Sequence, residues 1–251
     1  MGTTGAAYDG TMSRSDYGLD APGIVRLMLV GGAACVIASV ALARALSPAT
    51  LAHLRWVVAT LRWGGASYVL TGLMMLLSSR VGKLRLRDRL LDRLALATDA
   101  RVLDVGCGHG LLLIGAASRV PRGRAVGIDL WSQTDQHANS RAATLANAAH
   151  EGVADRVDVD DGDMRALPYP DASFDAVVSS LAIHNLPAAV DRERAVNEIA
   201  RVLRPGGRVA IVDIAHVGAY ATTLRAAGFR DVRSALTPWI FPPSRVLTAR
   251  K

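Results

Sequence analysis

A glycine-rich turn at residues 106–110 is the feature of this sequence best suited to holding a ligand. It follows the apolar residues Val102, Leu103 and Val105, which predict a buried strand, and an apolar helical pattern starts at Leu111. A strand that turns through glycines into a helix leaves backbone N–H groups and the positive helix end uncovered, so a ligand can approach the bare backbone. Taken alone, such a turn is equally compatible with a tight turn that binds nothing. Other motifs therefore decide its meaning.

Acidic residues stand where two further strands are expected to end. Residues 124–129 predict a strand that closes on Asp129, and residues 157–164 predict a third strand with the loop that contains Asp163. In an open α/β sheet, ligands bind beyond the carboxyl ends of the strands, where these residues would gather. One carboxylate can accept hydrogen bonds from hydroxyls on two neighbouring carbons, which suits Asp129 to a ribose. The alternative for each acid, taken singly, is a solvated strand end or a helix cap.

Two more stretches complete a set of five motifs. Residues 174–180 predict a fourth strand, and the turn at residues 203–207 (Leu-Arg-Pro-Gly-Gly) leads into a fifth at residues 208–213. In this order the motifs resemble those of the class I S-adenosylmethionine (SAM)-dependent methyltransferases, in the group that includes quinone and small-molecule methylases. The resemblance covers roughly residues 95–251. It implies SAM as the cofactor and transfer of its methyl group to an acceptor.

The resemblance also assigns roles to individual residues. Asp104 holds the acidic position of the family's Asp-x-Gly-x-Gly-x-Gly pattern, near the cofactor's ammonium group. Asp129 matches the acid on the ribose, Asp163 the acid that accepts from the adenine amino group, and Met164 would pack on the adenine ring. The complete set expected to bind the cofactor is Asp104, Gly106, Cys107, Gly108, Gly110, Asp129, Leu130, Asp163, Met164 and Ser180.

The end of the fourth strand faces the transferring methyl group in this family. His184 lies just beyond it and is the candidate catalytic residue, because imidazole can act as a general base near neutral pH. The alternative is a histidine that only lines the pocket. Nucleic-acid methylases of this class carry an Asn/Asp-Pro-Pro-Tyr/Phe motif here, which grips a flipped base. Residues 179–185 lack it, so a nucleic-acid target is not expected, and no Cys/His spacing predicts a metal.

Two rival functions use similar motifs. A nicotinamide-binding Rossmann domain also has a glycine turn and a strand-end acid, but its fingerprint is Gly-x-Gly-x-x-Gly, whereas this chain has Gly-Cys-Gly-His-Gly. A protein that holds SAM without catalysis would carry the same cofactor motifs. It stays open as an alternative.

The N-terminal third of the chain has a different character. The chain has 251 residues, 51% hydrophobic residues and a net charge of +7, and the apolar excess lies before residue 80. Residues 27–43 and 63–79 are each uncharged and flanked by arginines. At ~1.5 Å per residue each helix would be about 25 Å long, near the lower limit for crossing a membrane. The sequence therefore predicts two transmembrane helices that form a hairpin.

The expected location is the cytoplasmic membrane, with the catalytic domain facing the cytoplasm. The arginines that follow residue 79 should stay on the cytoplasmic side, which leaves residues 47–61 outside. The alternatives are a cleaved signal peptide ending near Ala43 and two amphipathic helices lying in the membrane interface. Cys35 and Cys107 are not placed for a disulfide, in keeping with a reducing compartment.

The sequence divides into four parts. These are an N-terminal tail at residues 1–23, the hairpin at 24–79, a basic amphipathic linker helix at 80–98 and the methyltransferase-like domain at 99–251. The expected fold is α/β, a Rossmann-like doubly wound, mostly parallel sheet with a C-terminal antiparallel hairpin. The expected function is methyl transfer to a small, lipophilic, membrane-associated acceptor. A membrane-tethered methyltransferase of a soluble small molecule is the alternative.

Overall fold

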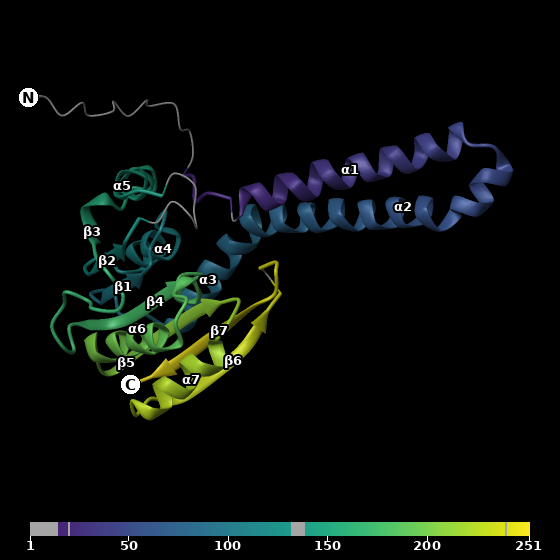
Figure 1. Ribbon diagram of the computed structural model, residues 1–251. Coiled ribbons are helices and arrows are strands. Elements are labelled where there is room, and N and C mark those ends of the chain that lie inside the picture. Colours follow the sequence, from purple (N-terminus) through teal and green to yellow (C-terminus); the bar gives the residue numbers. More distant parts are fainter. Residues whose placement is uncertain (1–14, 20, 132–138, 239) are drawn as a thin grey trace, which may run out of the picture.

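The computed structural model describes residues 15–19, 21–131, 139–238 and 240–251. Most of the predicted N-terminal tail lies outside these residues. Figure 1 shows a layered α/β domain from which two long helices project as a hairpin.

The sheet has seven strands in the order β3-β2-β1-β4-β5-β7-β6. The strands are β1 (Arg101–Val105), β2 (Arg124–Asp129), β3 (Val157–Asp161), β4 (Phe174–Ser180), β5 (Leu203–Asp213), β6 (Arg230–Thr237) and β7 (Ser244–Arg250). β1 to β5 are parallel, and β7 is antiparallel to both β5 and β6. The predicted Rossmann-like, mostly parallel sheet with an antiparallel C-terminal pair is therefore confirmed.

Helices cover both faces of the sheet, because successive apolar side chains of each parallel strand point to opposite faces. On one face lie α3 (Lys83–Leu94), α4 (Leu111–Arg119) and α5 (Arg141–His150); on the other lie α6 (Ala189–Val202) and α7 (Val217–Ala226). In β1, Val102 packs with the first set and Leu103 with the second. Burying both faces explains why these strands read as nearly continuous apolar runs.

The fifth strand starts earlier than the sequence predicts. Leu203 already pairs with Phe174, and the next partners are Arg208 and Ala176. Residues 204–207, expected to be a turn before the strand, therefore bulge out of the register inside it. Gly206 has φ +79°, a conformation that glycine adopts without strain.

The hairpin consists of α1 (Pro22–Ala45) and α2 (Pro48–Leu77), packed along their length. A Cβ atom on Gly32 would lie 2.6 Å from the carbonyl oxygen of Gly65, so glycine at these positions allows the two backbones to approach. Only residues 46–47 connect the helices. Residues 48–61, expected between two membrane spans, instead lie in the first half of α2. Ser47 caps the N-terminus of this helix, because its side chain accepts a hydrogen bond from the Thr50 N–H.

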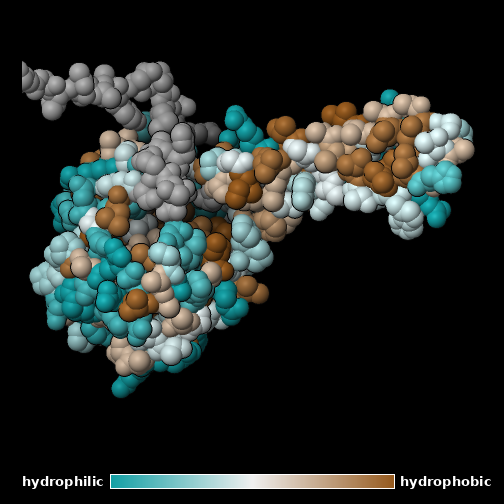
Figure 2. Space-filling model, in the orientation of Figure 1, coloured by the Kyte–Doolittle hydropathy of each residue, from teal (hydrophilic) through white to brown (hydrophobic). Residues whose placement is uncertain are grey.

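α1 is the single helix among the described residues that is long and apolar enough to cross a membrane by length and composition. α2 has 30 residues but carries Arg55 and Arg62 in its first half. The second predicted transmembrane helix is therefore not established by length and composition. Figure 2 shows hydrophobic surface spread along the hairpin and a mostly hydrophilic surface on the α/β domain.

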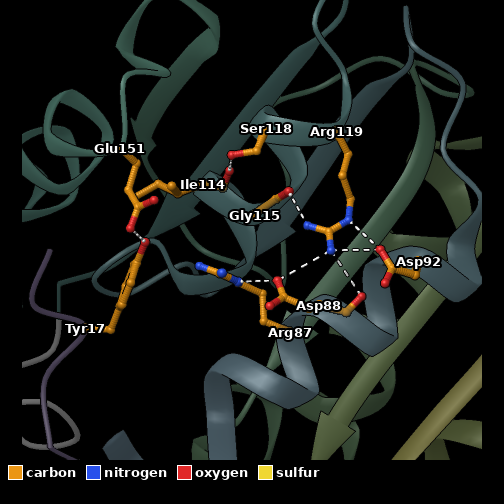
Figure 3. Close-up of polar contacts among 9 residues, drawn as sticks. All are labelled: Tyr17, Arg87, Asp88, Asp92, Ile114, Gly115, Ser118, Arg119 and Glu151. Carbon is orange, nitrogen blue, oxygen red and sulfur yellow. Dashed lines mark hydrogen bonds and ion pairs between the residues drawn. The ribbon is translucent and has the colours of Figure 1, made fainter. Parts of the chain in front are cut away.

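A π-helical turn, η1 (Ser78–Gly82), joins α2 to α3 at the base of the hairpin. α3 then packs on α4, where a Cβ on Gly115 would meet Leu91 at 2.8 Å. The Arg119 guanidinium fixes the pair by donating to the Asp92 carboxylate at 2.8 Å and to the backbone carbonyl of Asp88 at 3.2 Å (Figure 3). The predicted linker segment is therefore a helix packed on the sheet domain.

The short segment at residues 15–19, here called the strap, crosses α5 and the end of the glycine turn. The Asp16 N–H donates to Asn147 Oδ1, and Asn147 Nδ2 donates to the carbonyls of Asp16 and His109. Tyr17 is buried, and its hydroxyl lies 3.2 Å from Glu151 Oε1 (Figure 3). The buried Lys83 ammonium donates to the carbonyls of Tyr17 and Gly18.

The close packing of α1 on α2 can be tested by crosslinking. A Cβ on Gly65 would lie 2.8 Å from the Cβ of Cys35 and 2.6 Å from the carbonyl oxygen of Gly32, so the helices must separate by about 1 Å before a thiol there reaches disulfide geometry. We expect Gly65→Cys to form a disulfide with Cys35 under mild oxidation, seen as loss of both free thiols by mass spectrometry. Gly64→Cys is the control, because no atom lies within 4 Å of a Cβ there. Equal crosslinking of both variants would contradict the packing.

Candidate active site

The candidate site lies at the carboxyl edge of the sheet, where β1 has β2 on one side and β4 on the other. The chain order reverses at this point, and the loops after β1 and β4 leave in opposite directions. Such a switch point opens a crevice between the loops. The residues that follow β1, β2, β3 and β4 all meet at this edge.

The glycine turn after β1 is held against the end of β2. The N–H groups of Gly106 and Cys107 donate to the carbonyl of Ile128, at 2.8 and 3.2 Å. Gly106 has φ +72°, and a Cβ there would lie 2.3 Å from the Cβ of Ala182 after β4. A side chain at residue 106 would therefore both strain the backbone and strike the neighbouring loop.

Asp129 closes the other side of the turn. Its carboxylate accepts from the N–H of Gly108 at 2.8 Å and from the N–H of Trp131 at 2.7 Å. Asn139 Nδ2 lies 3.4 Å from the same carboxylate. Leu130, beside it, is 60% exposed. Sequence reasoning missed Trp131 and Asn139, whose only signal was their closeness in the chain to Asp129.

Asp104 is buried beneath the turn. Its carboxylate accepts from the N–H of Leu113 at 2.8 Å, so it satisfies a free donor in the first turn of α4. Burial raises the pKa of this carboxyl to about 8, and the nearby Asp129 charge acts in the same direction. Cys107, also buried, has a thiol pKa well above its usual value, which makes it a poor nucleophile.

The loop after β3 carries Asp163 and Met164. The Met164 methyl group would lie 3.5 Å from a Cβ on Gly106, so this side chain borders the turn. The Arg165 guanidinium donates to both oxygens of Asp163, at 2.6 to 3.0 Å, and this hydrogen bonding lowers the pKa of the Asp163 carboxyl. A ligand that uses Asp163 as an acceptor has to share this carboxylate with Arg165, which sequence reasoning did not include.

His184 and Asp213 form a pair across the ends of β4 and β5. His184 Nδ1 lies 2.6 Å from Asp213 Oδ1, a contact that is an ion pair only when the imidazole is protonated and that lacks the alignment of a hydrogen bond. The fully buried Asp213 carboxylate also accepts from the backbone N–H groups of His184 and Ile214, and the Tyr220 hydroxyl lies 3.3 Å from it. Sequence reasoning missed Asp213, although its place at the end of the fifth strand was a usable signal.

The last strand-end residue predicted to bind the cofactor is Ser180. It ends β4 and is half-buried, whereas its neighbour Ser179 is buried and donates to the carbonyl of Val105. That bond ties β4 to the strand that leads into the glycine turn. The edge thus combines a glycine turn, a strand-end acid and an imidazole held by a carboxylate.

Comparison with known proteins identifies this domain. Residues 103–211 match the family model described as "Methyltransferase domain". The chain is 40% identical over 131 residues to 27-O-demethylrifamycin SV methyltransferase of Amycolatopsis mediterranei, covering 51% of this chain and 44% of that protein. It is 32% identical over 128 residues to a demethylmenaquinone methyltransferase of Lactiplantibacillus plantarum, covering 51% and 50%. The chain thus aligns with half or less of the length of these relatives.

Among solved structures, the crystal structure of the [4+2]-cyclase SpnF is similar, with a TM-score of 0.56, 25% identity, and coverage of 67% of this chain and 81% of that one. A cyclase can therefore be built on the same fold, so the fold alone does not define the chemistry. The family match and the relatives do define the domain. The chain carries a methyltransferase domain.

The buried Asp104 predicts an unusual pH dependence of stability. In the unfolded chain an aspartate loses its proton near pH 4, whereas in the folded protein Asp104 keeps it until about pH 8. Its contribution to stability is therefore full below pH 4 and is lost as the pH rises toward 8. We expect Asp104→Asn to lack this decline, measured as the difference in free energy of urea unfolding between pH 5 and 8. Equal slopes for both proteins would contradict it.

Asp129 should control cofactor affinity. Asp129→Asn keeps the size of the side chain but removes the charge, and one charged hydrogen bond is worth about 1.5–3 kcal/mol. We expect SAM affinity, measured by calorimetry, to fall about 10-fold or more. Asp158→Asn is the control, because Asp158 pairs with Arg124 away from the site. Unchanged affinity in Asp129→Asn would remove Asp129 from the binding site.

Proposed function

We propose that this chain transfers a methyl group from SAM to a small, lipophilic acceptor at a membrane surface. The observation that carries the proposal is the His184–Asp213 pair, which lies at the same sheet edge as the glycine turn and Asp129. A cofactor site and a candidate base therefore open on one crevice.

The residues of the edge fit the cofactor. Gly106 and Gly108 have φ of +72° and +50°, so this turn offers backbone groups rather than side chains to a ligand. In this proposal Asp129 accepts from the ribose hydroxyls, Asp104 lies near the ammonium group, and Met164 borders the adenine ring. SAM supplies an electrophilic methyl group when bound, so the protein's own task is to align an acceptor atom with it.

His184 is proposed to accept the proton from that acceptor atom. Asp213 holds Nδ1 and the backbone N–H of His184, which leaves Nε2 as the ring nitrogen available to the acceptor. The His184 side chain is 20% exposed, whereas Asp213 is fully buried. The partly exposed imidazole can therefore contact a ligand. Asp213 does not contact the ligand itself and is a positioning residue for His184.

The proposed membrane association rests on the hairpin. Large apolar residues are exposed on both helices, with Leu27 and Ile37 on α1 and Leu70 and Leu77 on α2 among them. Such a long exposed apolar surface is costly in water and is covered in a bilayer. The uncharged stretch of α2 is the half nearer the domain, where it packs against α1.

The base of the hairpin contacts a loop at the same carboxyl edge of the sheet, which is why a bilayer-borne acceptor is proposed. The Phe241 N–H, in the loop between β6 and β7, donates to Ser78 Oγ at 2.8 Å. That loop lies at the edge where Asp213 ends β5, because Arg245 at the start of β7 pairs with Asp213. An acceptor leaving the bilayer at the hairpin base would therefore have a short path to His184.

The relatives suggest the class of acceptor. The names of the two relatives compared here specify a demethylrifamycin and a demethylmenaquinone as substrates. Both relatives thus act on small organic molecules, and a quinone-like or isoprenoid acceptor suits a membrane-associated enzyme. A soluble acceptor, with the hairpin serving only as a tether, is the alternative. SAM binding without methyl transfer is a further alternative.

The base role of His184 makes a kinetic prediction. We expect His184→Gln to lower kcat by about 10²–10⁴-fold, because general base catalysis contributes that much, while SAM affinity stays unchanged. Asp213→Asn should lower kcat less, and Asp213→Glu should restore part of it. The acidic limb of the pH–rate profile should disappear in His184→Gln. A kcat loss under tenfold would leave His184 as a pocket-lining residue.

The proposal as a whole is tested by label transfer. The full chain, reconstituted in liposomes, is incubated with methyl-labelled SAM and either a membrane lipid extract or a water-soluble metabolite extract. We expect the label in the lipid fraction, absent with His184→Gln. Label only in the soluble fraction would support the tethered enzyme, and SAM binding without any labelled product would support the non-catalytic alternative.

A further inference from the structure

The charges of the N-terminal region are of one sign. Residues 21–87 contain eight lysines and arginines and no aspartate or glutamate. With a total net charge of +7, the rest of the chain sums to −1, because 7 minus 8 is −1. The basic character of the protein therefore belongs to the hairpin and its base rather than to the catalytic domain.

Two of these arginines lie toward the far end of the hairpin, and a third lies at the middle of α2. Because residues 46–47 connect the helices, Arg44 at the end of α1 and Arg55 in α2 both lie within ~12 Å of that connection, at ~1.5 Å per residue. Arg62 follows two turns later on α2. All three are exposed. We call Arg44, Arg55, Trp56, Arg62 and Trp63 the tip cluster.

Two tryptophans accompany these arginines. Trp56 is 72% exposed and Trp63 is 73% exposed, and their spacing of seven residues puts both on one side of α2. The Arg55 guanidinium lies 5.4 Å from the centre of the Trp56 ring, within cation–π range. Exposed tryptophan beside arginine is typical of the zone between lipid tails and head groups.

Uncharged helix separates the tip cluster from the domain. On α2 the charge-free stretch beyond Trp63, residues 64–77, is ~21 Å long. On α1 the charge-free stretch Leu27–Ala43 is ~25 Å long, and its far half lies beside the tip cluster, because Cys35 packs on Gly65. Arg26 and Arg80 flank these stretches at the domain end. This length is somewhat below the ~30 Å of a hydrocarbon core, and long arginine side chains can extend toward the head groups to make up the difference.

We propose that the tip cluster binds the phosphate head groups of anionic phospholipids in the leaflet away from the catalytic domain. Charge complementarity carries the proposal, since the whole hairpin lacks acids that could neutralise its arginines. A guanidinium binds a phosphate with paired N–H donors, and the tryptophan rings fit the zone just beneath. The inference rests on the membrane insertion proposed above and is independent of methyl transfer.

A nucleic acid is the other polyanion that a basic, aromatic surface could bind. The structure favours lipid, because the two helices that carry the arginines of the tip cluster also expose large apolar residues such as Leu70 and Ile37. A nucleic-acid groove would leave that apolar surface in water. The experiment therefore includes a nucleic acid as a competing outcome.

Native mass spectrometry of the full chain in detergent tests the lipid preference. With equal phosphatidylglycerol and phosphatidylcholine, we expect the wild-type chain to retain phosphatidylglycerol. The variant Arg55→Gln/Arg62→Gln should lose most of these adducts, about tenfold or more for two basic contacts. The matched control is Arg230→Gln/Arg233→Gln, which removes two exposed arginines from the catalytic domain. Equal retention by the two double variants would overturn the proposal.

Fluorescence quenching in liposomes tests the depth separately. In a background with Trp63→Phe, Trp131→Phe and Trp239→Phe, which leaves Trp56 as the single tryptophan, lipids brominated near the head group should quench Trp56 more than lipids brominated near the chain end. No quenching by either lipid would show that the hairpin is not inserted, which overturns the membrane proposal as well. Strongest quenching of Trp56 by the deep bromines, or tip-dependent binding of an oligonucleotide, would overturn this inference alone. SAM binding, measured on the same variants, shows separately whether the cofactor site has failed.

Discussion

The close approach of the β1 and β4 loops is the constraint on which the site depends. It is possible only because residue 106 has no side chain: a Cβ there would lie 2.3 Å from that of Ala182. The approach brings the glycine turn, held by Ile128 and Asp129 from β2, beside the loop that carries His184. Cofactor loop and candidate base are thus brought together by packing at a single position.

The polar groups around this contact are arranged in two layers. Asp104 and Ser179 are buried and bond to backbone groups of α4 and β1, so they fix the framework. Asp129 and His184 lie at the surface of the crevice, each held in place by neighbours but partly open to a ligand. Asp213 is buried like Asp104 and Ser179, and it contacts His184 in the outer layer. This separation lets the site keep its shape while its outer groups meet ligands.

Sequence reasoning predicted the sheet well because its parallel strands leave strong apolar runs and its motifs follow one another in a fixed order. It failed where a role depends on tertiary contact. Asp213 becomes significant only because His184, from another strand end, packs against it. The start of α2 was missed because His53 and Arg55 interrupt the apolar pattern, although Ser47 and Pro48 are good helix-start signals. The roles of the cofactor-binding residues remain predictions.

The strap gives the hairpin a second attachment to the domain, and this has a thermodynamic consequence. α2 leads into the domain through η1, while α1 begins just after residues that bond to Asn147 and Lys83. Asn147 also holds the carbonyl of His109 in the glycine turn. Binding equilibria linked through shared contacts are reciprocal. Any change that cofactor binding makes in the free energy of strap docking must therefore appear, with equal magnitude, as the difference in cofactor affinity between the protein with the strap docked and the protein with it released.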